Sequence, residues 1–374
     1  MATDKLGLYV HIPYCIRKCN YCDFCSLPLG GGAVPESYVA RLIDELRAYS
    51  DVKKPPLTTV YFGGGTPSLL EPHVMEKILL AIRESFDIAD TAEITLEANP
   101  GTLTEEKAFA YKRLGFNRVS LGLQSIHQKE MKKLGRIHDF DDFLKSYDSL
   151  RRAGFDNINV DLMYGIPHQT KESFLETLDT VISLSPEHIS CYGLIIEEGT
   201  PFFSEADSLD VPDTDCECDM YELAARRLAE GGYSHYEISN YAKAGFESRH
   251  NLIYWSYDEY IGVGAAAHSF FDGVRRSNTE DVEKYIASVC ISPKEEHSPD
   301  RDEMAYEYAM LKLRLKCGFS LTEYEERFGV SFLDGREESL RKMRESGLLK
   351  LEDGRIFLTE RGFYVSNGIL VEIL

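Results

Sequence analysis

Short apolar segments alternate with longer amphipathic segments six times over the first 245 residues of the chain. The apolar segments are rich in strand-forming residues, and the amphipathic ones repeat apolar residues at i, i+3 and i+4, as helices do. Six such units predict an α/β fold with a parallel sheet and outer helices, either a partial barrel or a doubly wound sheet. The expected strands are 6–12, 59–62, 93–97, 118–123, 157–163 and 188–194, and the expected helices are roughly 36–50, 72–86, 104–114, 139–154, 171–184 and 214–231.

Residues suited to chemistry come directly after these strands. They are found at 13–15, 63–67, 97–101, 122–125 and 161–167. The carboxyl ends of parallel strands meet at one edge of a sheet, so the loops there converge on a single mouth. The sequence therefore predicts one ligand site at this edge.

The pattern changes after residue 245. An aromatic, glycine-rich segment covers 250–273, a helix is expected at 280–288, and 292–300 is a polar, proline-containing linker. Helices at roughly 301–316, 320–328 and 334–346 then precede a hairpin, whose strands 348–351 and 356–359 flank Asp353-Gly354. We divide the chain into 1–245, 246–300 and 301–374, the last being a winged-helix-like domain. Such a domain binds DNA or acts as a structural cap, and the lack of a basic stripe favours the cap.

The overall charge narrows the classes of partner. With 62 acidic and 41 basic side chains, the chain carries a formal net charge of −21, which argues against nucleic acid as a partner. No stretch reaches the roughly 18 to 20 apolar residues needed to span a bilayer, and the first residues lack the pattern of a signal peptide. We expect a cytoplasmic protein without a membrane span.

Four of the nine cysteines crowd into one short loop, at Cys15, Cys19, Cys22 and Cys25. In a reducing compartment such crowding indicates a metal or cluster more than disulfides. The spacing Cys15-x3-Cys19-x2-Cys22 supplies three thiolates, which can hold three irons of a cubane cluster and leave the fourth iron open. The alternative is structural zinc with Cys25 as the fourth ligand, although no second ligand pair is evident. The remaining cysteines read as small, partly buried apolar residues: Cys191, Cys216, Cys218, Cys290 and Cys317.

The segment around this loop, Tyr9-Val-His-Ile-Pro-Tyr-Cys15-x3-Cys19-x-Tyr21-Cys22-Asp-Phe, resembles the radical S-adenosylmethionine superfamily. The agreement continues through FGGGTPS at 62–68, ExNPG at 97–101, SLGLQS at 120–125 and DLMYGIP at 161–167. The resemblance implies a partial (β/α)6 barrel with a [4Fe-4S] cluster on Cys15, Cys19 and Cys22. It also implies S-adenosylmethionine on the open iron, with ligand-binding positions at Tyr9, Tyr21, Gly65, Thr66, Glu97, Gln124, Arg136 and Asp161.

Within the superfamily, the chain is most similar to oxygen-independent coproporphyrinogen III oxidase and to the HemW-type heme chaperones. The oxidase has a further cysteine where this chain has Phe24, whereas the segment 250–255 matches the HNxxYW signature of the chaperones. That resemblance implies heme binding, with His250 as the candidate ligand, although a histidine before an aromatic cluster is by itself more often a hydrogen-bonded core residue. His11 and His268 are further candidates, for which the structural interpretation is favoured. It implies a carrier that takes an electron from a donor and delivers heme to acceptor apoproteins. The alternative is an enzyme that decarboxylates coproporphyrinogen III oxidatively.

Overall fold

The computed structural model describes residues 5–289 and 293–374 and contains a 12-stranded mixed sheet. Its centre is formed by the six predicted strands, which pair in parallel in their chain order. They are β1 (Leu6–Ile12), β4 (Leu57–Gly64), β5 (Ile88–Ala98), β6 (Arg118–Gln124), β7 (Ile158–Tyr164) and β8 (His188–Gly193). All but the 11-residue β5 are short, and apart from the first residues of β5 these strands are largely buried, as expected for strands covered on both faces.

The sheet extends beyond both ends of this series, which the sequence did not predict. At one edge, β11 (Glu259–Val263) pairs in parallel with β1 and is followed by the antiparallel strands β12 (His268–Phe271), β13 (Val274–Ser277) and β14 (Glu295–His297). At the other edge, β10 (Asn240–Ala242) and β9 (Ser234–Glu237) follow β8. The segment expected to be a polar linker therefore contains a strand, because edge strands need little apolar sequence.

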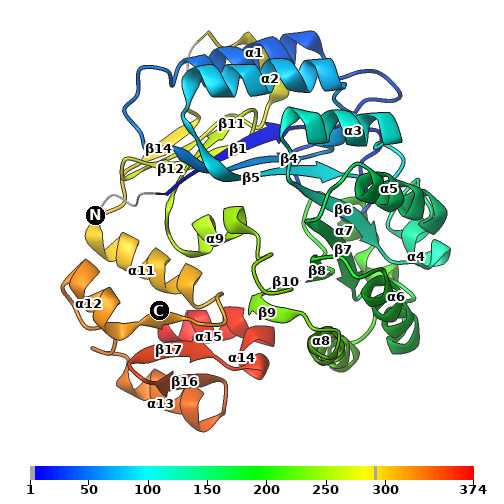
Figure 1. The fold of residues 1–374 in the computed structure, drawn as a ribbon. Coiled ribbons are helices and arrows are strands. Elements are labelled where there is room, and N and C mark those ends of the chain that lie inside the picture. The colour runs from blue at the N-terminus through cyan, green and yellow to red at the C-terminus, as the bar shows by residue number, and fades with distance from the viewer. Residues whose placement is uncertain (1–4, 290–292) are drawn as a thin grey trace.

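Six helices cover the outer face of the curved sheet, and α9 (Arg249–Trp255) lies on its inner side (Figure 1). The outer helices match the predicted series, because each buries one apolar face against the strands. They are α1 (Glu36–Arg47), α2 (Pro72–Ser85), α3 (Glu105–Leu114), α5 (Phe140–Arg152), α6 (Lys171–Leu184) and α8 (Thr214–Glu230). The shorter α4 (Gln128–Lys133), α7 (Pro201–Ser204) and α10 (Val282–Ala287) lie in the connections.

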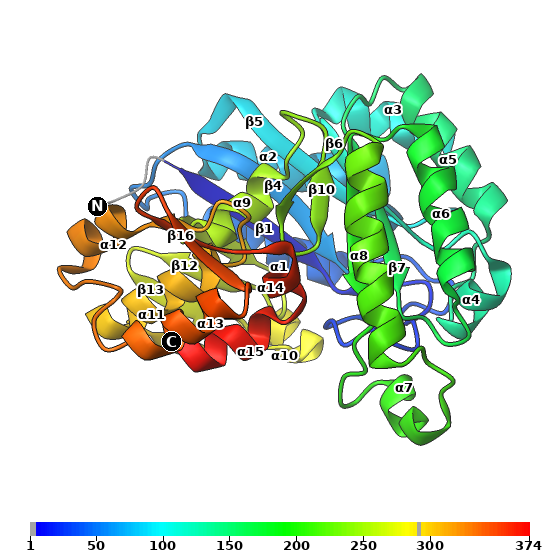
Figure 2. The same ribbon diagram turned by 90° about the horizontal axis from the view of Figure 1, so that it is seen from below.

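The C-terminal part lies to one side of the sheet, across from α5 and α6 in both views (Figures 1 and 2). It has its own apolar core, which includes Tyr308, Phe319 and Ile356. The expected hairpin is present, with left-handed Asp353 and Gly354 in its turn. The elements are α11 (Arg301–Lys312), β15 (Phe319–Ser320), α12 (Leu321–Phe328), α13 (Glu337–Glu345), β16 (Leu349–Glu352), β17 (Arg355–Leu358), α14 (Glu360–Tyr364) and α15 (Ser366–Ile373).

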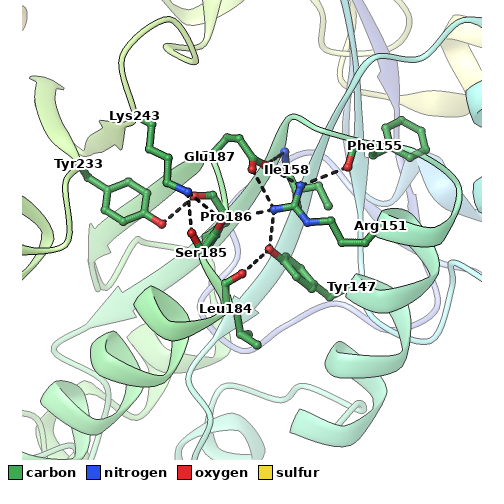
Figure 3. Close-up of polar contacts among 10 residues, drawn as sticks. All are labelled: Tyr147, Arg151, Phe155, Ile158, Leu184, Ser185, Pro186, Glu187, Tyr233 and Lys243. Carbon is green, nitrogen blue, oxygen red and sulfur yellow. Dashed lines mark hydrogen bonds and ion pairs between the residues drawn. The ribbon is translucent and has the colours of Figure 1, made fainter.

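A polar cluster ties the starts of β7 and β8 to α5, at the edge opposite the predicted site (Figure 3). Glu187 accepts hydrogen bonds from Arg151 Nη1 at 2.8 Å, from Arg151 Nη2 at 3.0 Å and from the Ile158 amide at 3.1 Å. The same guanidinium donates to the Tyr147 hydroxyl at 2.7 Å. This cluster contributes to the fold and does not line the candidate site.

Candidate functional site

A cavity of about 410 Å³ opens at the carboxyl edge of the sheet, where the sequence predicted a single site. Most of the predicted residues line it, together with Asn99 from the loop after β5. Two do not, namely Tyr9 and His250. Those that line it are Cys15, Cys19, Tyr21, Cys22, Gly65, Thr66, Glu97, Gln124, Arg136 and Asp161.

Three cysteines of the loop face this cavity, and the fourth faces away. The Thr66 hydroxyl lies 3.5 Å from Cys15 Sγ, and Arg136 Nη1 lies 3.8 Å from Cys19 Sγ. Cys25 instead directs its thiol to the carbonyl of Glu280, 3.3 Å away. Burial raises the pKa of the Cys15 thiol, an effect that a bound iron would oppose because metals deprotonate their thiol ligands. Cys290, one of the cysteines expected to be partly buried, lies outside the described residues.

The donor arrangement fits a cluster better than a single ion. Within residues 5–289 and 293–374, no three His, Cys, Asp or Glu side chains converge closely enough to hold one metal ion. A cubane cluster distributes its thiolates over separate irons, so its cysteine ligands need not meet at one point. Three cavity-facing thiols on one loop, with the fourth turned away, therefore fit a three-cysteine cluster.

Arg136 crosses the cavity beside the cysteine loop. Its guanidinium donates to Asn99 Oδ1 at 3.0 Å and to the Gly122 carbonyl at 3.1 Å, while its buried Nε has no partner among the described residues. A Cβ on Gly122 would lie 2.6 Å from Arg136 Nη2, so only glycine leaves room for the guanidinium there. Gln124 follows on the same strand face with a φ of 74°, a strained conformation that is common at functional sites. The arrangement suits recognition of a carboxylate.

Glu97 is a buried carboxylate in the wall of the cavity. It accepts hydrogen bonds from the Tyr61 hydroxyl at 2.7 Å and from the Gly64 amide at 3.1 Å. Burial raises the pKa of Glu97 to about 7, although both hydrogen bonds oppose the rise. Gly63 also leaves no room for a side chain, because a Cβ there would lie 2.9 Å from the Tyr9 ring. The glycine run thus allows these side chains to pack beside the cavity.

Asp161 heads a buried polar network. It accepts hydrogen bonds from Ser120 Oγ at 3.1 Å and from Asn159 Nδ2 at 2.7 Å. Asn159 Oδ1 lies 2.6 Å from His188 Nδ1, and His188 Nε2 lies 2.7 Å from the Tyr236 hydroxyl. These contacts fix the orientation of the Asp161 carboxylate toward the cavity.

His250 lies behind the cavity in a buried aromatic stack. Its ring is 5.0 Å from Tyr61 and 6.4 Å from Tyr9, measured between centroids. Both ring nitrogens have partners: Nδ1 lies 2.7 Å from Thr59 Oγ1, and Nε2 lies 2.8 Å from the Tyr254 hydroxyl. Burial and the nearby charge of Arg118 lower the pKa of His250 to about 3, so the imidazole is neutral. Heme iron could reach it only if one of these hydrogen bonds broke.

The other two candidate histidines differ in exposure. His11 is buried, with Nδ1 2.9 Å from the Tyr9 hydroxyl and Nε2 2.9 Å from the Cys25 carbonyl. His268 begins β12 and is exposed. Neither lines the cavity.

Several residues that line the cavity were missed. Asn99 is part of the ExNPG motif at 97–101, and that motif could have identified it. Asn251 belongs to the HNxxYW segment, in which only the neighbouring His250 was predicted to bind a ligand. Arg118 and Ser190 face inward from within strands, where no loop or glycine marks them.

Fold and cavity together define the class of protein. The chain matches the Radical SAM superfamily model over residues 9–181 and the HemN C-terminal domain model over residues 300–365. It is also similar in structure to coproporphyrinogen III oxidase (HemN) from Escherichia coli, with a TM-score of 0.86 and 22% identity. That similarity covers 98% of this chain and 89% of the other, and it shows the fold alone.

Curated relatives narrow the class to one family. The heme chaperone HemW of Lactococcus lactis is 35% identical, over 100% of this chain and 98% of the relative. The HemW of Bacillus subtilis is 35% identical over 96% and 97%, and that of Escherichia coli is 37% identical over 83% and 82%. The chain belongs to the HemW family of the radical SAM superfamily. Throughout the part of the chain that the structure describes, no helix combines the length and apolarity required to cross a membrane.

Proposed function

We propose that this protein is a heme chaperone that binds a [4Fe-4S] cluster, S-adenosylmethionine and heme, and delivers heme to acceptor proteins. The main support is the near full-length similarity to proteins named heme chaperone HemW. The cavity adds support, because it brings three cysteines of one loop together with a buried arginine and two carboxylates.

Each cavity residue has a role in this proposal. Cys15, Cys19 and Cys22 hold the cluster, and Arg136 pairs with the carboxylate of S-adenosylmethionine. Glu97 and Asp161 accept hydrogen bonds from its ribose hydroxyls or its ammonium group. Tyr21, Gly65, Thr66 and Gln124 complete the wall. When bound, the cluster and S-adenosylmethionine supply one-electron chemistry, and the protein positions and shields them.

For heme we propose His250 of α9 as a ligand, with a condition set by the structure. Both ring nitrogens are hydrogen-bonded, so ligation requires Tyr254 or Thr59 to release the ring. In the proposal Tyr9 does not contact the ligand and instead positions Tyr61, which lines the cavity. The centroids of their stacked rings are 6.2 Å apart.

The alternative function is oxidative decarboxylation of coproporphyrinogen III, as suggested by the fold shared with the oxidase. Phe24 stands where the oxidase has a further cysteine, and it lines the cavity mouth with 65% of its surface exposed. Cys25, one residue later, faces away from the cavity. These two residues favour the chaperone.

One anaerobic experiment separates the two functions. The reconstituted protein is incubated with dithionite, S-adenosylmethionine and coproporphyrinogen III, and a parallel sample receives heme. We expect no protoporphyrinogen IX, and we expect heme to remain bound, with a Soret band, through gel filtration. Sustained formation of protoporphyrinogen IX would instead support the oxidase.

We also propose that an electron donor reduces the protein and that the protein is cytoplasmic. Its proposed domains are 1–245, 246–300 and 301–374. The eight cysteines that the structure describes are all free, as expected in a reducing compartment. A separate apolar core supports the C-terminal domain, whereas strands β11 to β14 belong to the main sheet.

A further inference from the structure

Arg118 places a buried charge in the cavity without a direct partner. It is the first residue of β6 and is only 2% exposed, and it lines the cavity from the strand face that also carries Ser120, Gly122 and Gln124. Its Nε is buried and unbonded, and no hydrogen bond or ion pair reaches its guanidinium from residues 5–289 or 293–374. Burying an unpaired charge costs free energy, and an anionic ligand that paired with Arg118 would offset this cost.

The carboxylates nearby are occupied by other donors. The two oxygens of Glu97 accept from the Tyr61 hydroxyl and the Gly64 amide. Those of Asp161 accept from Ser120 and Asn159. Glu97 interacts with Arg118 electrostatically at longer range, but neither carboxylate forms an ion pair with it. The guanidinium donors therefore remain available to a bound molecule.

Arg118 lies far from the cysteine loop along the strand. It is six positions before Gln124, about 20 Å of extended chain. Arg136 stands near the other end, beside Cys19. The cavity thus carries two guanidinium groups, one next to the cysteines and one deep within it.

Asn251 adds a neutral donor to the same cavity. It is the second residue of the HNxxYW segment on α9, and no hydrogen bond to its side chain is found in the described part of the chain. Its amide can donate to an oxygen anion.

We infer that Arg118 and Asn251 form a carboxylate-binding subsite in the depth of the cavity, separate from the group that Arg136 takes beside the cysteines. This inference rests on the proposed function, since it deepens the recognition of the same ligands. Because Arg136 takes the carboxylate of S-adenosylmethionine beside the cysteines, the carboxylate at this subsite is a propionate of heme. Arg118 pairs with it bidentately, and Asn251 donates to it from α9.

Ligand pairs that differ by the carboxylate test the subsite. Anaerobically reconstituted protein is titrated with S-adenosylmethionine and its decarboxylated form, and with heme and heme dimethyl ester. The variants are Arg118→Gln, Asn251→Ala and, as a control on the exposed surface of α3, Arg113→Gln.

We expect Arg118→Gln to weaken binding of heme by about 10-fold or more, as for loss of a charge-assisted hydrogen bond. Heme dimethyl ester should bind wild type and variant equally. A carboxylate-dependent loss for S-adenosylmethionine instead of heme would contradict the assignment. Asn251→Ala should show the same pattern more weakly, and Arg113→Gln should match wild type.

Two results would overturn the subsite. An equal loss for the acid and its carboxylate-free partner would make Arg118 a general countercharge for Glu97 and Asp161, and unchanged affinities would remove it from binding. If wild type binds neither S-adenosylmethionine nor heme, the proposed function fails as well. If wild type binds both ligands and Arg118→Gln binds them equally well, only the subsite fails.

The stability of Arg118→Met distinguishes a binding role from a structural one. Removing an unpaired buried charge should leave the unfolding midpoint of the ligand-free protein unchanged or raise it. A marked decrease in the midpoint, without a carboxylate-dependent change in affinity, would assign Arg118 to the fold and contradict the inference.

Discussion

The Tyr61 hydroxyl donates a 2.7 Å hydrogen bond to Glu97 across the neighbouring strands β4 and β5. The tyrosine ring also stacks on His250 from α9, with 5.0 Å between centroids. Tyr61 therefore contacts both the wall of the cavity and the HNxxYW segment. This one side chain therefore contacts both the candidate heme ligand, His250, and a residue of the candidate S-adenosylmethionine site, Glu97.

The pKa of Glu97 predicts a pH dependence of stability. Burial raises this pKa from 4.5 to about 7, so between these values the unfolded chain has lost a proton that the folded protein keeps. Stability of the ligand-free protein should fall as pH rises through this window, by about 3 kcal/mol at most. Glu97→Gln should reduce the decline in urea unfolding at pH 5 to 8, with the remainder due to Glu237, whose pKa burial also raises to about 7, and the exposed Glu106→Gln should not change it. An unchanged profile in Glu97→Gln would show that Glu97 ionises normally.

The cysteine assignment predicts opposite outcomes for two neighbouring substitutions. Cys19→Ser should abolish the cluster, because Cys19 faces the cavity beside Arg136. Cys25→Ser should keep it, because that thiol points to the Glu280 carbonyl. Iron and acid-labile sulfide are measured after anaerobic reconstitution. Full iron and sulfide in Cys19→Ser, or their loss in Cys25→Ser, would refute the assignment.

Gly122→Ala should weaken S-adenosylmethionine binding. The new Cβ would lie 2.6 Å from Arg136 Nη2 and 3.1 Å from Asn99 Oδ1, so the guanidinium must move. We expect a loss of affinity of about 10-fold or more by calorimetry. Gly368→Ala serves as the control, because its Cβ would meet no atom within 4 Å. Equal affinities in Gly122→Ala and wild type would mean that Arg136 does not contact the ligand.

Arg151→Met should lower stability and leave the site intact. It removes two hydrogen bonds to Glu187, whose side chain is only 14% exposed, at the edge opposite the cavity (Figure 3). We expect a loss of about 1–3 kcal/mol in urea unfolding, with unchanged iron content. Arg341→Met breaks an exposed pair with Glu345 and should cost less than about 1 kcal/mol. Similar losses for the two variants would contradict the structural role of the Arg151 cluster.

The His250 proposal predicts changes of opposite sign. His250→Ala should weaken heme binding and reduce the Soret band, because it removes the iron ligand. Tyr254→Phe should strengthen binding, because it frees His250 Nε2 from a 2.8 Å hydrogen bond. Heme titrations followed by absorbance measure both. If His250→Ala keeps the wild-type spectrum and affinity, the ligand is another residue.

The central fold was predictable because each of the six units carries its own local pattern. Strand β6, for example, alternates Val119, Leu121 and Leu123 with polar or small residues, and α5 begins with the capping box of Asp139 and Asp142. The added strands were not predictable in this way. β11 is five residues long and β14 is three, and their pairing depends on contacts far apart in the sequence.

The cavity shows the same division between local and long-range information. Residues that follow strands, such as Thr66, were found from motifs and from the rule that parallel strands end together, whereas Arg136 was named only from the resemblance to the oxidase family. Arg118 was missed, because the direction of a charged side chain at the start of a strand is known only once the strand register is known. His250 as a heme ligand stays a prediction. The alternative considered from the sequence, a hydrogen-bonded core histidine, matches its contacts, but its partners in β4 and α9 could not be named in advance.

Electron paramagnetic resonance of the dithionite-reduced protein, before and after addition of S-adenosylmethionine, tests the central claim most directly. Three cysteine ligands leave one iron open, so we predict a [4Fe-4S]⁺ signal whose g values shift when S-adenosylmethionine binds, in wild type and in Cys25→Ser alike. A protein that contains zinc, or a cluster signal that S-adenosylmethionine leaves unchanged, would contradict the account.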